Sequence, residues 1–152
     1  MALFEDQILL PCPPVALFEF FSRPANVARV ADPSLGLKIQ TSPDVISVGS
    51  RISFQMMAMN QIQSAIHEIT EYQPHDWFLE VQIEGPMKSW RHEHRFEEVG
   101  GETRMIDRIE FEKPGGIVGL LLSESRIQDM LEENFFQREQ ELRRLITRGG
   151  LS

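Results

Sequence analysis

The chain has 152 residues, which is enough for one hydrophobic core and too few for two, so we expect a single domain over residues 1–152. Hydrophobic residues at 41% and charged residues at 25% are typical of globular proteins and exclude disordered, coiled-coil and collagen-like classes. The net charge of -8 argues against nucleic acid as a partner, because binding to phosphates needs clustered lysine and arginine.

The single cysteine and the N-terminal residues favour a cytoplasmic location. The single cysteine, Cys12, excludes an intrachain disulfide and fits a reducing environment. Glu5 and Asp6 occupy the region where a secretory signal has basic residues. The longest apolar run, residues 117–122, is far shorter than the roughly 20 residues that span a bilayer. We therefore expect a cytoplasmic protein without stable membrane insertion.

The N-terminal third predicts one strand followed by two short helices. Residues 3–10 have the pattern of a strand, and the prolines of residues 11–14 end it because proline cannot donate to a strand ladder. Proline is favoured at the first turn of a helix, so a helix is expected over residues 15–21. Pro24 ends that helix and precedes a second one near residues 25–31.

Residues 37–111 change to a period of two, which predicts five or six antiparallel strands. Turns are expected near residues 42–44, 49, 60–61, 73–74, 85–86 and 100–101. The strand at residues 77–83 can turn either face inward. Its inner face is expected to carry one of two sets, Phe78, Glu80 and Gln82, or Leu79, Val81 and Ile83.

A single long helix is predicted from the glycines at 115 and 116 to those at 149 and 150. Its apolar stripe comprises Leu120, Ile127, Met130, Leu131, Phe135, Leu142 and Leu145. Only the sheet offers an apolar surface for this stripe, so the predicted fold is α+β, a curved antiparallel sheet around a long C-terminal helix. Asn134 and Arg138 fall near the centre of the stripe and are expected to enter the interior.

The hairpin at residues 90–111 sets an inside and an outside. A two-residue turn at Gly100 and Gly101 pairs residues whose numbers sum to 201. Three pairs of opposite charge then face each other on one side of the hairpin: Arg91 with Glu110, Glu93 with Arg108, and Glu97 with Arg104. A slip of one residue would lose all three pairs and reverse the two faces.

The opposite face of this hairpin is therefore the inner face. It places Trp90, His92, His94 and Phe96 across from Phe111, Ile109, Asp107 and Met105. A packed core rarely accepts two histidines and an aspartate, whereas a ligand cavity needs a few convergent polar groups. We therefore expect a cavity for a small, largely apolar ligand. The stretch at residues 56–59 either lines that cavity or fills a gap in the core.

The run from Gly85 to Glu97, with its Trp90, His92, His94 and Phe96, followed by Asp107, resembles the SRPBCC, or START-related, superfamily, in particular small bacterial proteins close to polyketide cyclases/dehydrases. The resemblance extends over nearly the whole chain. It implies the helix-grip fold and a deep cavity that binds lipids, sterols or polyketides. The residues that match the subgroup run are Trp90, His92, His94 and Asp107; the positions of Asn134 and Arg138 come from helical periodicity alone.

Each candidate site residue has two interpretations. His94 with Asp107 is either an acid-base pair or a hydrogen-bonded pair that holds the hairpin. His92, His94 and Asp107 match a metal site only by a spacing that arises easily by chance, so we expect no metal and no cofactor. Arg138 either binds an anionic ligand group or pairs with Asp107. His67 and His75 are predicted to be structural or exposed.

Three functions follow. The first is binding of a small hydrophobic ligand, with contacts from Trp90, His92, His94, Phe96, Met105, Asp107, Ile109, Asn134 and Arg138. The second is a cyclase or dehydratase in which His94 and Asp107 are catalytic and Arg138 stabilises an enolate. The third is an interaction module, such as a homodimer, that uses exposed Phe136.

Overall fold

A computed structural model describes residues 1–58 and 60–151, and Met59 of the methionine stretch lies outside them. One antiparallel sheet has the strand order β1-β7-β6-β5-β4-β3-β2. Its strands are β1 (Ala2–Leu10), β2 (Lys38–Thr41), β3 (Arg51–Ala58), β4 (Gln61–Gln73), β5 (Trp77–Glu84), β6 (Ser89–Val99) and β7 (Glu102–Glu112). The helices are α1 (Pro14–Phe21), α2 (Pro24–Val30), α3 (Gly116–Leu121) and α4 (Glu124–Thr147), with a 3-10 turn, η1 (Pro33–Leu35).

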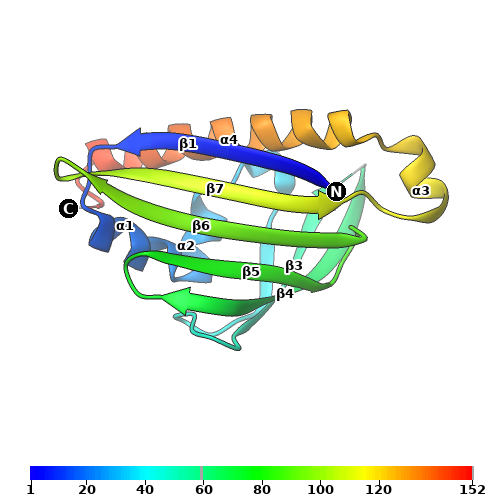
Figure 1. Cartoon of the computed structure of the whole chain (residues 1–152), viewed down its shortest axis with the longest axis horizontal. Helices are drawn as coiled ribbons and strands as arrows, with labels where there is room; N and C mark the ends of the chain where they lie inside the picture. The colour runs from blue at the N-terminus through cyan, green and yellow to red at the C-terminus, as the bar shows by residue number, and fades with distance from the viewer. Residues whose placement is uncertain (59, 152) are drawn as a thin grey trace.

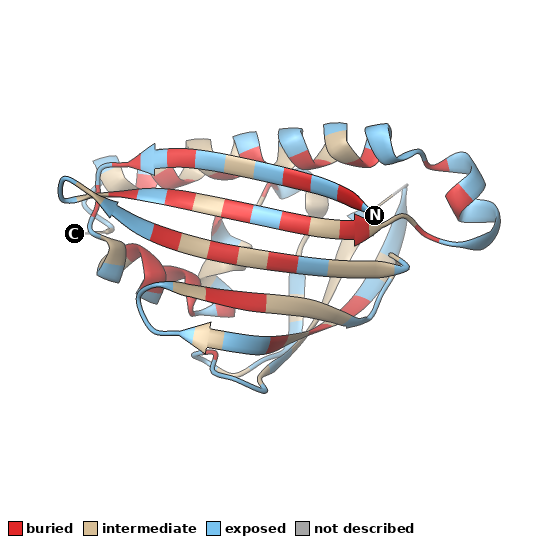
Figure 2. Cartoon of the chain, viewed as in Figure 1, coloured by how far each residue is buried: buried red, intermediate tan, exposed pale blue. Residues whose placement is uncertain are grey.

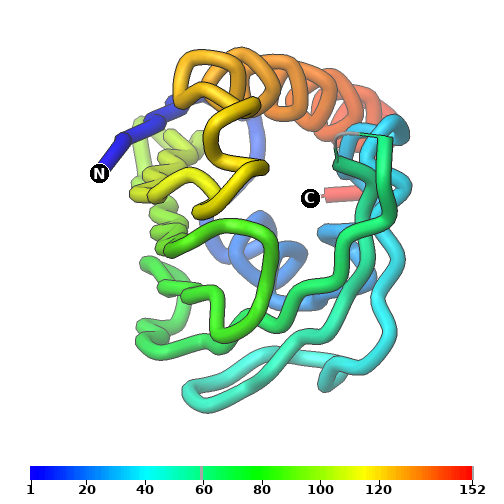
Figure 3. Tube along the Cα trace, turned by 90° about the vertical axis from the view of Figure 1, so that its right-hand side faces the viewer, coloured from blue at the N-terminus to red at the C-terminus, as the bar shows by residue number. Residues whose placement is uncertain are grey.

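The sheet curves around the interior, and α4 lies along its open side (Figure 3). Helices α1 and α2 cover one end of the concave face, and α3 lies beyond the other end (Figure 1). The predicted α+β class, the helix-grip arrangement and the two short helices after the first strand are confirmed. None of the helices among the described residues is both long and apolar enough to span a bilayer.

The register predicted for the β6–β7 hairpin is confirmed. Trp90 pairs with Phe111 and His94 pairs with Asp107, so the facing residue numbers sum to 201 throughout the hairpin. Gly100 and Gly101 have φ values of 60° and 85°, the left-handed pair that a type I′ turn requires. On the outer face, Arg91 Nη1 lies 3.8 Å from Glu110 Oε1.

The structure also determines which face of β5 points inward. Phe78, Glu80 and Gln82 line the interior, whereas Ile83 is exposed. Pairing of β5 with β6 is regular and places Phe78 opposite His94, an inward residue that lines the cavity. The shift between Ile69 and Glu71 inserts its extra residue on β4 and leaves the alternation along β5 unchanged. Glu80 is therefore an interior acid and lies directly opposite His92 on β6.

The prediction of one long C-terminal helix is wrong at its beginning. Leu122 is extended (φ -112°, ψ 109°) and separates α3 from α4. The Ser123 hydroxyl accepts a hydrogen bond from the Arg126 backbone N–H at 3.2 Å and so caps α4. Leu122 turns into the core, whereas Leu120, which was expected on the buried stripe, is 85% exposed.

The core consists of two apolar clusters. The first cluster lies under α1 and contains Leu10, Leu17, Phe18, Phe21, Phe78, Phe96, Met105 and Leu142, among others. The second lies beneath the beginning of α4 and contains Phe4, Ile109, Phe111, Leu122, Ile127, Leu131 and Phe135. Buried positions alternate with half-buried or exposed ones along β1, β6 and β7 (Figure 2). On β7 the inward residues run from Met105 in the first cluster to Ile109 in the second, with Asp107 between them.

Candidate functional site

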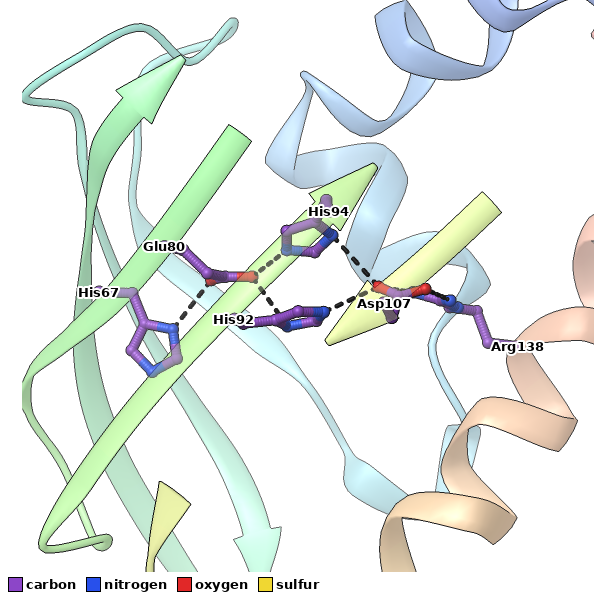
Figure 4. Close-up of polar contacts among 6 residues, drawn as sticks. All are labelled: His67, Glu80, His92, His94, Asp107 and Arg138. Carbon is purple, nitrogen blue, oxygen red and sulfur yellow. Dashed lines mark hydrogen bonds and ion pairs between the residues drawn. The ribbon is translucent and has the colours of Figure 1, made fainter. Parts of the chain in front are cut away.

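Six polar side chains form a connected row in the interior (Figure 4). We call it the polar belt, and it consists of His67 on β4, Glu80 on β5, His92 and His94 on β6, Asp107 on β7 and Arg138 on α4. The strand members meet because they are inward residues of neighbouring strands, with Glu80 opposite His92 and His94 opposite Asp107, and Arg138 reaches them from α4.

Asp107 anchors one end of the belt and is fully buried. Its Oδ1 lies 2.7 Å from His92 Nε2 and 3.3 Å from Arg138 Nη1, and its Oδ2 contacts Arg138 Nη2. His94 Nδ1 lies 3.4 Å from Asp107 Oδ1 but has no hydrogen-bond partner. The guanidinium also lies over Phe135, with its Cζ 4.2 Å from the ring centroid. The Arg138 guanidinium is therefore held by the Asp107 carboxylate and by the Phe135 ring of its own helix, α4.

The Glu80 carboxylate is the acceptor on which the histidines at the other end of the polar belt converge. Its Oε1 lies 2.6 Å from His94 Nε2 and 3.3 Å from His92 Nδ1, and its Oε2 lies 2.9 Å from His67 Nδ1. Three imidazoles thus converge on one carboxylate. The rings of His92 and His94 are stacked with centroids 3.7 Å apart, and Phe78 stacks on the other face of His94 at 4.2 Å. This stack fixes the orientation of the His94 ring.

Burial opposes ionisation of both carboxyl groups, but their partners outweigh it. The pKa of Asp107 is held well below its usual value by the Arg138 charge and by His92 and His94. The pKa of Glu80 is likewise lowered well below its usual value by hydrogen bonds from His67, His92 and His94. Burial also disfavours charged His94, yet Asp107 and Glu80 raise its pKa.

These shifts set the charge of the belt. Two ionised carboxylates and one guanidinium leave a net charge of one negative unit, which a single protonated imidazole balances. His94 is the histidine whose pKa is raised, and protonation would direct its Nδ1–H toward Asp107. Ionised carboxylates only accept hydrogen bonds, so His67 Nδ1 and His94 Nε2 donate to Glu80, and His92 Nε2 donates to Asp107.

A cavity of about 280 Å³ lies between the sheet and α4. Most of its wall is apolar and includes Ile52, Phe54, Met56, Ala65, Met130 and Leu131. His67, Glu80, His92, His94 and Arg138 of the polar belt also line it. The cavity is therefore an apolar space with its polar groups gathered in one band.

Comparisons with solved structures identify the fold. The chain is similar to TTHA0849 from Thermus thermophilus, with 18% identity, a TM-score of 0.72, and coverage of 97% of this chain and 99% of that chain. It is also similar to major latex-like protein 151 from Panax ginseng, with 16% identity, a TM-score of 0.67, and coverage of 93% and 95%. The protein Ara h 8.0201 shows 14% identity and a TM-score of 0.66, with coverage of 96% and 98%.

These likenesses show that the chain has the helix-grip fold, a curved antiparallel sheet around a long C-terminal helix. The resemblance stated from the sequence is thereby confirmed for the architecture, and identities this low carry the fold alone. No protein-family model matches the sequence, and no curated protein matches it significantly.

Within this helix-grip fold, the structure divides the predicted ligand-contacting residues into two groups. The cavity is lined by Trp90, His92, His94, Ile109, Asn134 and Arg138. Phe96 and Met105 are instead packed in the first core cluster, and Asp107 lies behind His92 and His94. The residues fall into two groups because the inner face of the β6–β7 hairpin is longer than the cavity. Its residues beyond the end of the cavity are packed in the core.

The contacts of His67, His94 and Arg138 bear on three predictions. His67, predicted to be structural or exposed, is buried, lines the cavity and bonds Glu80. His94 makes its hydrogen bond with Glu80, and it is His92 that bonds Asp107. The Arg138 ion pair with Asp107, one of its two predicted interpretations, is the one present.

Proposed function

We propose that the protein binds a small, largely hydrophobic molecule with one polar, uncharged end in the cavity. The cavity of about 280 Å³ with its mostly apolar wall carries this proposal. Its size is near the lower limit of small-molecule sites, about 300–1,000 Å³, which favours a ligand of one ring or a short chain.

The polar belt determines which end group the ligand presents. Arg138 is already paired with Asp107, so it does not supply a free cation for a carboxylate or phosphate. Protonation of His94, which its raised pKa favours, leaves the belt without net charge, and a neutral belt favours a hydroxyl or carbonyl over a charged group. The amide of Asn134 and the Glu80–His67 pair offer both donors and acceptors at the cavity wall.

Native mass spectrometry of the purified protein, compared with its denatured mass, tests the proposal directly. A bound organic molecule is expected to leave only on denaturation. A second arm titrates the uncharged fluorescent apolar probe N-phenyl-1-naphthylamine. Ala65 is buried in the cavity wall, so Ala65→Phe fills the space and should abolish the fluorescence gain. Phe136→Ala, on the exposed face of α4, is the matched control. Equal probe binding by all three proteins would place the probe elsewhere and contradict the proposal.

A second candidate is a cyclase or dehydratase that uses His94 in acid-base chemistry. The contacts that favour it are the two carboxylates on opposite sides of His94, Glu80 at 2.6 Å and Asp107 at 3.4 Å. With a raised pKa, His94 suits the role of general acid, which protonates a leaving hydroxyl, better than that of base. Glu80, rather than Asp107, is then its immediate partner.

The mass of the bound molecule separates the two candidates. An enzyme that removes water should carry product in the wild type and substrate, heavier by one water molecule, in His94→Ala. A binding protein should carry the same molecule in both. Loss of all bound material in His94→Ala, with the fold intact by circular dichroism, would remove the acid-base role.

A further inference from the structure

We propose that Glu80, His92 and His94 form a binding site for one divalent transition-metal ion with the preferences of Zn²⁺. One ligand atom from each residue can be chosen so that all three lie within 4.8 Å of one another. Imidazole nitrogens and a carboxylate oxygen are the donors that Zn²⁺ and neighbouring first-row metals prefer. This inference does not depend on the identity of the ligand proposed for the cavity.

The distances are close to those of a metal centre. Tetrahedral ligands at about 2.0–2.1 Å from zinc lie about 3.3 Å from one another. Glu80 Oε1 and His92 Nδ1 are 3.3 Å apart, which already fits. Glu80 Oε1 and His94 Nε2 are 2.6 Å apart and must separate by about 0.7 Å, a small rotation of the glutamate side chain.

Groups around the three ligands support them as outer partners do in metal sites. Metal-bound histidines donate their other ring N–H to a carboxylate, which fixes ring orientation and tautomer. Asp107 is in that position for both histidines, 2.7 Å from His92 Nε2 and 3.4 Å from His94 Nδ1. Arg138 in turn holds Asp107, and His67 holds the second oxygen of Glu80.

Electrostatics and access also suit a cation. With all three histidines of the belt neutral, the two carboxylates and the guanidinium sum to one negative charge in a buried region. The three ligands all line the cavity, so the remaining coordination position is open to water or to a molecule held there. The alternative is that the belt is a self-sufficient hydrogen-bond network, and this alternative predicts no metal affinity.

Calorimetric titration of EDTA-treated protein with Zn²⁺ tests the proposal, and Co²⁺ adds a visible spectrum that reports the ligand geometry. One equivalent is expected to bind to the wild type. Glu80→Gln and His92→Ala should each weaken binding by at least about 100-fold, and Asp107→Asn by about 10–100-fold. His75→Ala, which removes a half-exposed histidine outside the belt, should bind like the wild type.

An additional measurement on the wild type covers the case in which a variant does not fold. In ¹⁵N-labelled protein, Zn²⁺ should shift the imidazole resonances of His92 and His94 and leave those of His75 unchanged. Absence of stoichiometric binding by the wild type, or shifts confined to His75, would overturn the proposal. Probe binding by the EDTA-treated protein is measured separately, so a failed metal site and a failed ligand cavity give different results.

Discussion

The buried ion pair of Asp107 with Arg138 makes a sharp prediction for Asp107→Asn. The substitution would keep the size of the side chain but remove its charge, and Arg138, only 8% exposed, would lose its anion. Breaking a buried pair by removing one partner costs about 3–5 kcal/mol, because it leaves an uncompensated charge. A domain of this size has a total stability of about 5–15 kcal/mol, so the variant is expected to be marginally folded.

Urea unfolding at pH 7, followed by circular dichroism, measures this loss. EDTA is included so that metal binding does not add to the stability of the folded state. Asp44→Asn, at an exposed position, is the control and should change the free energy of unfolding by less than about 0.5 kcal/mol.

The double variant Asp107→Asn/Arg138→Met distinguishes a lost charge pair from general disruption. It removes the unpaired cation, so it should be more stable than Asp107→Asn alone, although it carries one more substitution. If Asp107→Asn stays within about 1 kcal/mol of the wild type, Arg138 is not held as a buried charge. The reasoning about the belt would then be refuted.

Three further predictions concern packing, capping and pH. Leu142→Ala, in the first core cluster, should cost about 2–5 kcal/mol in urea unfolding, whereas Leu120→Ala, on exposed α3, should change stability by less than about 0.5 kcal/mol. Ser123→Ala removes the cap of α4 and should cost about 1 kcal/mol, while equal stability would show that the Arg126 N–H finds another partner. Burial and the Asp107 charge raise the pKa of Asp6, so its contribution to stability is full below the unfolded pKa of about 3.9 and is lost as the pH rises. Asp6→Asn should therefore be more stable than the wild type at pH 7, by less than about 1 kcal/mol, and the difference should vanish below pH 4; a difference independent of pH would contradict this.

The register of the β6–β7 hairpin could be predicted from the sequence because two independent local features indicate the same register. The two glycines permit only a short turn, and three opposite-charge pairs select the same register independently. The inner row from Trp90 to Phe96 follows directly. The depth of the cavity does not follow, because whether an inward residue meets open space or another side chain depends on elements distant in sequence. Phe96 and Met105 illustrate this, since α1 fills the space in front of them.

The centre of the site could not be predicted for a related reason. Glu80 points inward because β5 pairs with β6 in the register that places Glu80 opposite His92, and the turn residues between these two strands do not specify that register. The partner of His67 could not be identified from the sequence either, because that partner is Glu80. By contrast, the break before α4 was predictable, because Ser123 is a favourable cap immediately before a run of helix-forming residues.

The stability of the fold does not explain why six polar residues form the belt. A buried ion pair is often no more stabilising than well-packed apolar residues, and apolar side chains in these six positions would join the two core clusters into one. Within the belt, Asp107 and Arg138 bind each other, and Asp107 lies behind the histidines rather than at the cavity wall. Glu80 is the member whose carboxylate both gathers the histidines and lines the cavity. Glu80 and the histidines can therefore share either a proton or a metal ion, and titration with Zn²⁺ distinguishes these two states of the belt, whether or not a ligand occupies the cavity.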